Sequence, residues 1–213
     1  MIQIENIPAW LREHGHFVLR RGKIPYTLSG VAHLPKSPAD CGTIEEALAA
    51  WKKHPELYDG IGIMIAPPLV GIDLDHVISK EGELAPVAQD ILGMVDTYTE
   101  KSPSGAGLHL LGLAPGMTVD TRKYLTGKLH GDVKVETYFK GRYFTFTGES
   151  FMGGEIREIG DAVQRVLDTY LTRSTMTTEG EWKSSPEQEP DARSEEEVAL
   201  DAAVVLDRMQ RGE

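Results

Sequence analysis

Val70-Gly-Ile-Asp-Leu-Asp75 is an apolar segment with two carboxylates at alternating positions. Because side chains alternate along a strand, Val70, Ile72 and Leu74 are expected to point into the core, and Asp73 and Asp75 to share the opposite face. Two carboxylates held this close repel each other, and a divalent cation that prefers oxygen ligands, Mg²⁺ or Mn²⁺, removes the conflict. The segment predicts a buried strand with a metal-binding face. A strand end whose aspartates cap a turn or face water is an equally open interpretation of this segment alone.

The composition is ordinary for a globular protein, since 40% of the 213 residues are hydrophobic and 26% are charged. This length allows one large domain or two smaller lobes with a real core. The single cysteine, Cys41, excludes a disulfide framework and a cysteine-rich zinc site. There is no apolar run of membrane-spanning length and no signal-peptide pattern at the N-terminus. We therefore expect a cytoplasmic protein, of a bacterium or a phage-infected host, with no membrane partner.

The net charge of −11 is unevenly distributed along the chain. Residues 174–213 contain 11 acidic and 4 basic residues, a net charge of −7, which leaves −4 on the first 173 residues. A strongly acidic protein is a poor partner for nucleic acid, but the body of this chain is close to balanced. The total charge therefore does not exclude a nucleic-acid function.

A change of composition after residue 173 predicts the domain organisation. Residues 1–173 contain all the candidate functional residues and are expected to form the catalytic domain. Residues 174–192 are rich in Ser, Thr, Glu and Pro, which predicts an acidic disordered linker. Residues 193–213 have apolar positions at helical spacing and are expected to start a helical segment that the chain truncates.

Hydrophobic periodicity predicts short strands mixed with helices, an α/β (α+β) fold. The expected strands are 16–21, 60–66, 70–75, 108–113, 133–139 and 143–147, and the expected helices are 7–14, 43–54, 85–97 and 161–171. Thr43 and Glu46 form a capping-box pattern at the start of the second helix. The last two strands are expected to pair as a hairpin around Lys140-Gly141-Arg142, and residues 22–41 are expected to be a loop.

A glycine-rich turn, Ser102-Pro-Ser-Gly-Ala-Gly-Leu-His109, leads into one of these strands. Gly105 and Gly107 allow backbone N–H groups to approach an anion, with Ser102 and Ser104 beside them. His109 adds a hydrogen-bond donor or a positive charge. The turn therefore predicts a nucleotide-binding loop, although a tight turn and a half-buried strand histidine also explain these residues.

Two further residues complete a possible catalytic set. Glu136 is a third carboxylate on a strand, and Arg142 lies at a turn from which it can reach a phosphate. Lys23 extends the possible basic surface with a weaker argument. Three carboxylates, a histidine and an arginine match the needs of two-metal phosphoryl transfer. Taken singly, Glu136 and Arg142 are also explained as a solvated strand residue and a surface arginine.

The order of three motifs resembles that of a known family. G-I-D-L-D is followed by S-P-S-G-x-G-L-H and then by V-E-x-Y-x-x-G-R-Y-F-T-x-T-G. This order is similar to that of the primase–polymerase domain of phages and plasmids, within the archaeo-eukaryotic primase superfamily. The likeness covers roughly Ile7 to Leu171 and is strongest for proteins in which a helicase follows the catalytic domain.

The resemblance implies a bilobal fold, with an N-terminal α/β lobe, an RRM-like lobe and the catalytic cleft between them. It implies that Asp73, Asp75 and Glu136 ligate two Mg²⁺ or Mn²⁺ ions, and that His109 and Arg142 contact the incoming triphosphate. The sequence departs from the superfamily where Gly107 replaces the serine of a Ser-x-His motif, with Ser102 and Ser104 as possible substitutes. It also departs in Glu136, where many relatives have aspartate.

The activity implied by the resemblance is template-directed nucleotidyl transfer, as a DNA primase, a DNA polymerase or both. Its partners would be a single-stranded DNA template, nucleoside triphosphates and a downstream helicase domain. Three alternatives use the same residues: a catalytically silent RRM-like nucleic-acid-binding module, a metal-dependent nuclease and a phosphatase of the haloacid-dehalogenase type. The phosphatase interpretation rests on the D-x-D-x-V pattern of Asp73 to Val77 and needs a later acidic pair, for which Gly160-Asp161 is a loose candidate.

Overall fold

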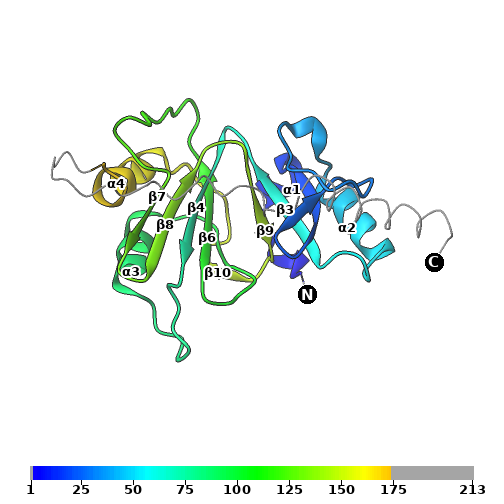
Figure 1. The fold of residues 1–213 in the computed structure, drawn as a ribbon, viewed down its shortest axis with the longest axis horizontal. Coiled ribbons are helices and arrows are strands. Elements are labelled where there is room, and N and C mark those ends of the chain that lie inside the picture. The colour runs from blue at the N-terminus through cyan, green and yellow to red at the C-terminus, as the bar shows by residue number, and fades with distance from the viewer. Residues whose placement is uncertain (1, 174–213) are drawn as a thin grey trace, which may run out of the picture.

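The computed structural model describes residues 2–173, which form two antiparallel sheets with helices at either end (Figure 1). The helices are α1 (Ala9–His14), α2 (Ile44–Lys53), α3 (Pro86–Met94) and α4 (Gly160–Tyr170), with short 3-10 turns η1 (Ile4–Asn6) and η2 (Pro38–Asp40). The predicted α+β class is confirmed. The predicted linker, residues 174–192, and the predicted helical segment, residues 193–213, lie outside the described residues. Within the described residues, no helix is long and apolar enough to cross a membrane.

The smaller sheet has four strands in the order β2-β1-β3-β9. Its strands are β1 (Phe17–Arg21), β2 (Ile24–Tyr26), β3 (Gly60–Ile65) and β9 (Arg142–Phe146). Figure 1 shows α1 and α2 on the side of this sheet that is remote from α3 and α4. Helix α2 starts with the predicted capping box: the Thr43 hydroxyl accepts from the Glu46 amide, and a Glu46 carboxylate oxygen accepts from the Thr43 amide.

The larger sheet has six strands in the order β10-β5-β6-β4-β8-β7. Its strands are β4 (Leu69–Asp75), β5 (Thr99–Lys101), β6 (Leu108–Leu113), β7 (Gly127–His130), β8 (Val133–Tyr138) and β10 (Ser150–Met152). Strand β4 lies in the middle, between β6 and β8. The acidic segment of the sequence is therefore at the centre of the sheet, where all its residues are buried except Asp73 and Asp75, which are partly buried.

Each face of the six-stranded sheet packs on a separate core. Ile72 and Leu74 are fully buried against α3 and α4, with Ile91 and Val166 among their neighbours. The other face packs against β3 and β9 of the four-stranded sheet, where Phe144 is a central contact. The alternation expected for β4 is thus confirmed, and Asp73 and Asp75 lie on the face turned toward the smaller sheet.

The predicted hairpin of residues 133–139 and 143–147 is wrong. Strand β8 pairs with β4, whereas β9 pairs with β3 in the other sheet, so the chain crosses between the sheets at residues 139–141. The sequence neighbour with which β8 does pair is β7, the strand that precedes it. Val135 of β8 enters one core and Phe144 of β9 the other. Strands β3 and β4 are likewise in different sheets, joined by Pro67-Pro68, which cannot donate hydrogen bonds to a ladder.

Four short strands are absent from the sequence prediction. Strand β2 lies in the segment expected to be a loop, and β5, β7 and β10 lie at or near the sheet edges. Each has three or four residues, too few to show alternation.

Candidate active site

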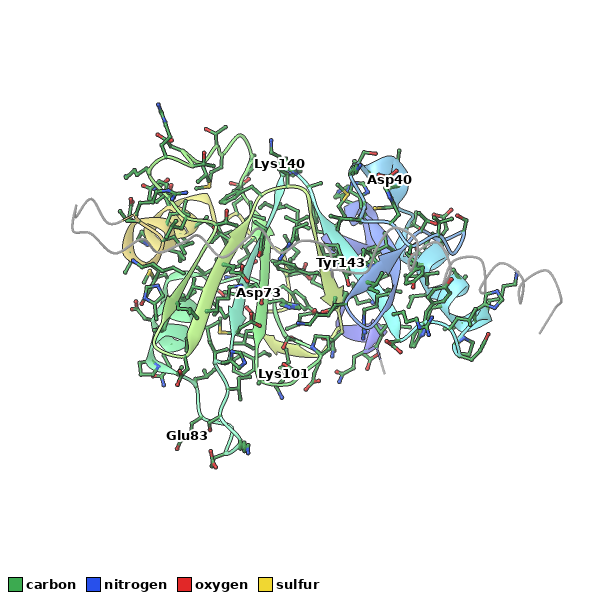
Figure 2. The ribbon with its side chains drawn as sticks, viewed as in Figure 1. Asp40, Asp73, Glu83, Lys101, Lys140 and Tyr143 are labelled. Carbon is green, nitrogen blue, oxygen red and sulfur yellow. The ribbon has the colours of Figure 1, made fainter. Side chains whose placement is uncertain are left out.

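Strand pairing brings the three predicted carboxylates together. In the register of the six-stranded sheet, Asp73 lies opposite Glu136 on one side and opposite His109 on the other. One ligand oxygen from each of Asp73, Asp75 and Glu136 lies within 4.8 Å of the others. Figure 2 labels Asp73, a residue of β4, near the middle of the molecule. Three converging carboxylates form an oxygen-only ligand set, which suits Mg²⁺ or Mn²⁺.

The environment of Asp73 fits a cation. Its Oδ1 atom is buried and has no hydrogen-bond partner among the described residues. Burial raises the pKa of Asp73 to about 6, helped by the charges of Asp75 and Glu136 and opposed by His109. A buried oxygen without a partner carries a large desolvation cost, and a bound cation would remove it.

Two neighbours already compensate Glu136. The Lys134 ammonium lies 3.0 Å from a Glu136 carboxylate oxygen, and the Tyr138 hydroxyl donates to the same oxygen at 2.8 Å. Burial and the Glu136 charge raise the pKa of Tyr138, so its hydroxyl stays a proton donor. Part of the acidic cluster is therefore compensated by the protein itself, whereas the Asp73 Oδ1 atom has only His109 Nε2 at 3.7 Å, beyond hydrogen-bond distance.

We expect Asp73→Asn to stabilise the metal-free protein above pH 6. The folded-state pKa lies above the ordinary value of 3.8, so ionising Asp73 costs stability as the pH rises from about 4 to 7. At about 1.4 kcal/mol per pKa unit, the variant should gain up to about 3 kcal/mol at pH 8 and little at pH 4. Denaturant unfolding in EDTA at both pH values measures this difference. Equal stability of variant and parent at pH 8 would contradict the electrostatic description.

His109 lies between two carboxylates. Its Nε2 atom is 3.7 Å from Asp73 Oδ1, and its Nδ1 atom is 3.5 Å from Glu100 Oε1. The ring packs on Phe144, with 4.8 Å between the ring centroids. Burial by itself would lower the pKa of His109, but the hydrogen bond to Glu100 and the charge of Asp73 raise it overall. A histidine in these surroundings can present a proton on its Nε2 atom to an anion.

The glycine-rich turn satisfies much of its own backbone. The Gly107 amide donates to the Ser102 hydroxyl at 3.2 Å, and the Ala106 amide donates to the Ser104 hydroxyl at 3.3 Å. Gly105 has a φ of 73°, which favours glycine. The two serines therefore shape the turn that precedes the strand of His109.

Gly107 cannot be replaced by serine without a rearrangement. A Cβ atom at this position would lie 2.8 Å from the Leu74 carbonyl oxygen and 2.9 Å from the Ser102 hydroxyl. The Ser102 hydroxyl thus lies close to the place where a side chain of residue 107 would project. This contact explains how the sequence can depart from Ser-x-His and still have a hydroxyl beside the strand of His109.

Arg142 approaches the acidic cluster from the other sheet, but Lys23 does not. The Arg142 guanidinium carbon lies 4.8 Å from the centre of the Tyr138 ring, and Tyr138 in turn contacts Glu136. Lys23 lies in the exposed turn between β1 and β2, and its carbonyl oxygen accepts from the Tyr143 hydroxyl. None of the contacts described for residues 2–173 joins the Lys23 ammonium to the acidic cluster.

Sequence reasoning missed Glu100, Lys134 and Tyr138. Glu100 has no exposed surface, although it lies in a three-residue strand with polar neighbours. Nothing in its local pattern distinguishes it from a solvated glutamate. For Lys134 and Tyr138 a signal was present, because both share the strand face of Glu136.

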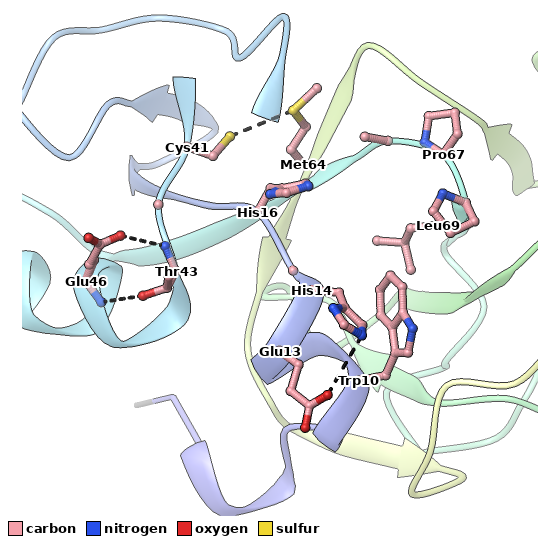
Figure 3. Close-up of a pocket in the computed structure, with 14 residues that line it drawn as sticks. Trp10, Glu13, His14, His16, Cys41, Thr43, Glu46, Met64, Pro67 and Leu69 are labelled. Carbon is pink, nitrogen blue, oxygen red and sulfur yellow. Dashed lines mark hydrogen bonds and ion pairs between the residues drawn. The ribbon is translucent and has the colours of Figure 1, made fainter. Parts of the chain in front are cut away.

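A separate pocket of about 740 Å³ lies at the ends of β1 and β3 (Figure 3). Trp10, His14 and His16 line it, together with Met64 and Leu69. Its lining includes none of the predicted site residues. The acidic cluster is therefore not part of this pocket.

Comparison with known proteins gives one informative relative. No family model matches the chain. The chain is 32% identical over 197 residues to the DNA primase-polymerase of Nitratiruptor phage NrS-1, and the match covers 90% of the chain. The chain spans about a quarter of the length of that phage protein, since the match covers 25% of it. This similarity confirms the resemblance to a primase–polymerase domain that the sequence motifs predict.

Proposed function

We propose that this chain catalyses template-directed nucleotidyl transfer on single-stranded DNA, as a primase, a DNA polymerase or both. The observation that carries the proposal is the cluster of Asp73, Asp75 and Glu136, in which a buried Asp73 oxygen has no hydrogen bond among the described residues. The similarity to a phage DNA primase-polymerase supports the same conclusion.

The three carboxylates are suited to hold two Mg²⁺ or Mn²⁺ ions. Bound metal ions would lower the barrier by neutralising charge on the triphosphate and favouring ionisation of the attacking hydroxyl. The chain's own groups would supply the ligand oxygens, from Asp73, Asp75 and Glu136. Lys134 keeps the cluster partly neutral before the substrates arrive.

His109 and Arg142 are suited to bind the incoming nucleotide. They lie in different sheets, His109 in β6 and Arg142 in β9. A triphosphate held there would be contacted by two positively charged or donor groups. Ser102, Ser104, Gly105 and Gly107 form the adjoining turn, and we propose that they shape the nucleotide pocket.

The two sheets are suited to be the two lobes of a primase fold. In this proposal the four-stranded sheet with α1 and α2 is the N-terminal lobe, and the six-stranded sheet with α3 and α4 is the RRM-like lobe. The template would lie along the face that carries the acidic cluster. A helicase domain would follow residues 174–213 in a longer protein.

The experiment that tests the function is primer extension on single-stranded DNA, with labelled nucleotides and either Mg²⁺ or Mn²⁺. Extension that EDTA abolishes is the expected result. Shortening of the labelled strand would instead indicate the nuclease, DNA binding without extension would indicate the silent RRM-like module, and phosphoaspartate trapping would indicate the phosphatase.

A second arm of this experiment tests the domain boundary. We expect residues 1–173 to extend a primer as well as the whole chain does, because the tail carries −7 of the net charge and none of the proposed site residues. An acidic segment competes, if anything, with DNA phosphates for basic groups. The two proteins are compared at equal concentration and ionic strength. A folded truncation that cannot extend a primer would place the tail inside the active unit.

A further inference from the structure

Glu100 is a buried carboxylate beside the proposed active site, and its side chain is fully enclosed. Its oxygens accept from the backbone amides of Thr147 and Gly148, at 3.2 and 2.8 Å, and from the Tyr98 hydroxyl at 3.1 Å. Each of these neighbours is a donor. A buried carboxylate with several donors is well satisfied, so both oxygens act as acceptors at this site.

The remaining neighbour of Glu100 is His109. The two residues lie directly opposite each other in the pairing of β5 with β6, and His109 Nδ1 is 3.5 Å from Glu100 Oε1. Because Glu100 only accepts, the Nδ1 atom must be the donor in this contact. The Nε2 atom then points to the acidic cluster, 3.7 Å from Asp73 Oδ1.

The contacts of Glu100 also join the two sheets. Thr147 and Gly148 follow directly after β9, which belongs to the four-stranded sheet. Glu100 belongs to the six-stranded sheet. The position of the His109 ring is therefore fixed from both sheets, by Glu100 at its edge and by Phe144 of β9 against its face.

We propose that Glu100 is a positioning residue for His109: it accepts a hydrogen bond from Nδ1–H and so holds the ring with Nε2 directed to the place where a triphosphate would bind. The orientation of His109 is inferred from the geometry alone. The role of His109 in contacting a nucleotide rests on the proposed function. A carboxylate that orients a functional histidine contributes about 10- to 100-fold to affinity or activity in comparable metal sites.

Glu100→Gln is the informative substitution because it keeps the size of the side chain. Its single carbonyl oxygen is needed by the Thr147 and Gly148 amides, so the new NH₂ group faces His109 Nδ1. That nitrogen must then accept, which moves the proton to Nε2. Tyr98→Phe is the matched control: it removes another hydrogen bond from the same carboxylate and leaves the Glu100–His109 contact in place.

The first measurement does not depend on enzyme activity. Long-range ¹H–¹⁵N NMR of the metal-free protein at pH 8 assigns the His109 tautomer. We expect a protonated Nδ1 in the parent chain and in Tyr98→Phe, and a protonated Nε2 in Glu100→Gln. The same tautomer in all three proteins would overturn the positioning role, even if the chain incorporated no nucleotide.

The second measurement is steady-state incorporation, with the same proteins and His109→Ala. We expect Glu100→Gln to reduce kcat/KM for the nucleotide about 10- to 100-fold, because a ring whose Nδ1 must accept stays neutral and loses the charge-assisted contact of Nε2–H with a phosphate. His109→Ala should add little to Glu100→Gln, because the two residues act as one unit. Two results would show that Glu100 has only a structural role. In the first, the losses of kcat/KM caused by Glu100→Gln and by His109→Ala multiply in the double variant. In the second, Glu100→Gln lowers the stability of the protein but leaves it as active as Tyr98→Phe.

Discussion

Replacing Asp73 and Asp75 together by alanine is expected to abolish nucleotide incorporation while the protein stays folded. The double variant loses two of the three carboxylates whose oxygens converge within 4.8 Å, and Glu136 alone offers too few ligands for a divalent cation. The change removes like charges that repel each other, so the metal-free variant should be as stable as the parent or more stable. Primer extension with Mg²⁺ or Mn²⁺ measures the activity, and thermal unfolding in EDTA measures the stability.

The control for this variant removes the same charge elsewhere. Glu81 and Glu83 are exposed in a loop that Figure 2 shows projecting away from Asp73, and Glu83 is labelled there. Glu81→Ala/Glu83→Ala changes the net charge equally and should leave extension intact. Near-normal extension by the verified Asp73→Ala/Asp75→Ala protein would contradict the proposed mechanism.

Alanine at His109 or Arg142 is expected to impair nucleotide use more than template binding. A charge-assisted hydrogen bond contributes roughly 1.5–3 kcal/mol, which corresponds to about 10- to 150-fold in an equilibrium or a rate. The two side chains belong to different sheets, so each single substitution should weaken nucleotide use while the other residue stays unchanged. Steady-state kinetics with varied nucleotide, together with a DNA-binding titration, separates the two effects.

Lys140→Ala serves as the control for Arg142→Ala. Lys140 is an exposed residue of the segment 139–141, which crosses between the sheets just before Arg142, and Figure 2 labels it at the edge of the molecule. Its loss removes one positive charge and should change nucleotide use little. If His109→Ala and Arg142→Ala weakened only DNA binding, their assignment to the triphosphate would be wrong.

The central strand could be predicted from the sequence because its pattern is local. Ile72 and Leu74 alternate with Asp73 and Asp75, and this alternation alone determines which side chains enter the core. The capping box at Thr43 is likewise local, since its hydrogen bonds join residues three apart. Such features depend on short stretches of chain, and the structure has them where the sequence predicts them.

The pairing of strands could not be predicted in the same way. Residues 133–139 and 143–147 have the pattern of a hairpin, but β8 pairs with β7 and with the distant β4, and β9 pairs with the distant β3. Glu100 was missed for a related reason. The groups that compensate its charge, among them the Thr147 and Gly148 amides and His109, come from other segments of the chain. Motif order indicated the candidate site residues, whereas the contacts that surround them depend on tertiary structure.

The pairing of Asp73 with both His109 and Glu136 has a consequence for folding. These residues come from three strands that are separated by long stretches of chain. Bringing the strands together lowers the conformational entropy of the chain before any contact forms. A chain in which β4 has not yet found β6 and β8 has no acidic cluster. Any cation that selects the cluster therefore binds only the closed sheet, and its binding free energy adds to the cooperativity of the whole molecule.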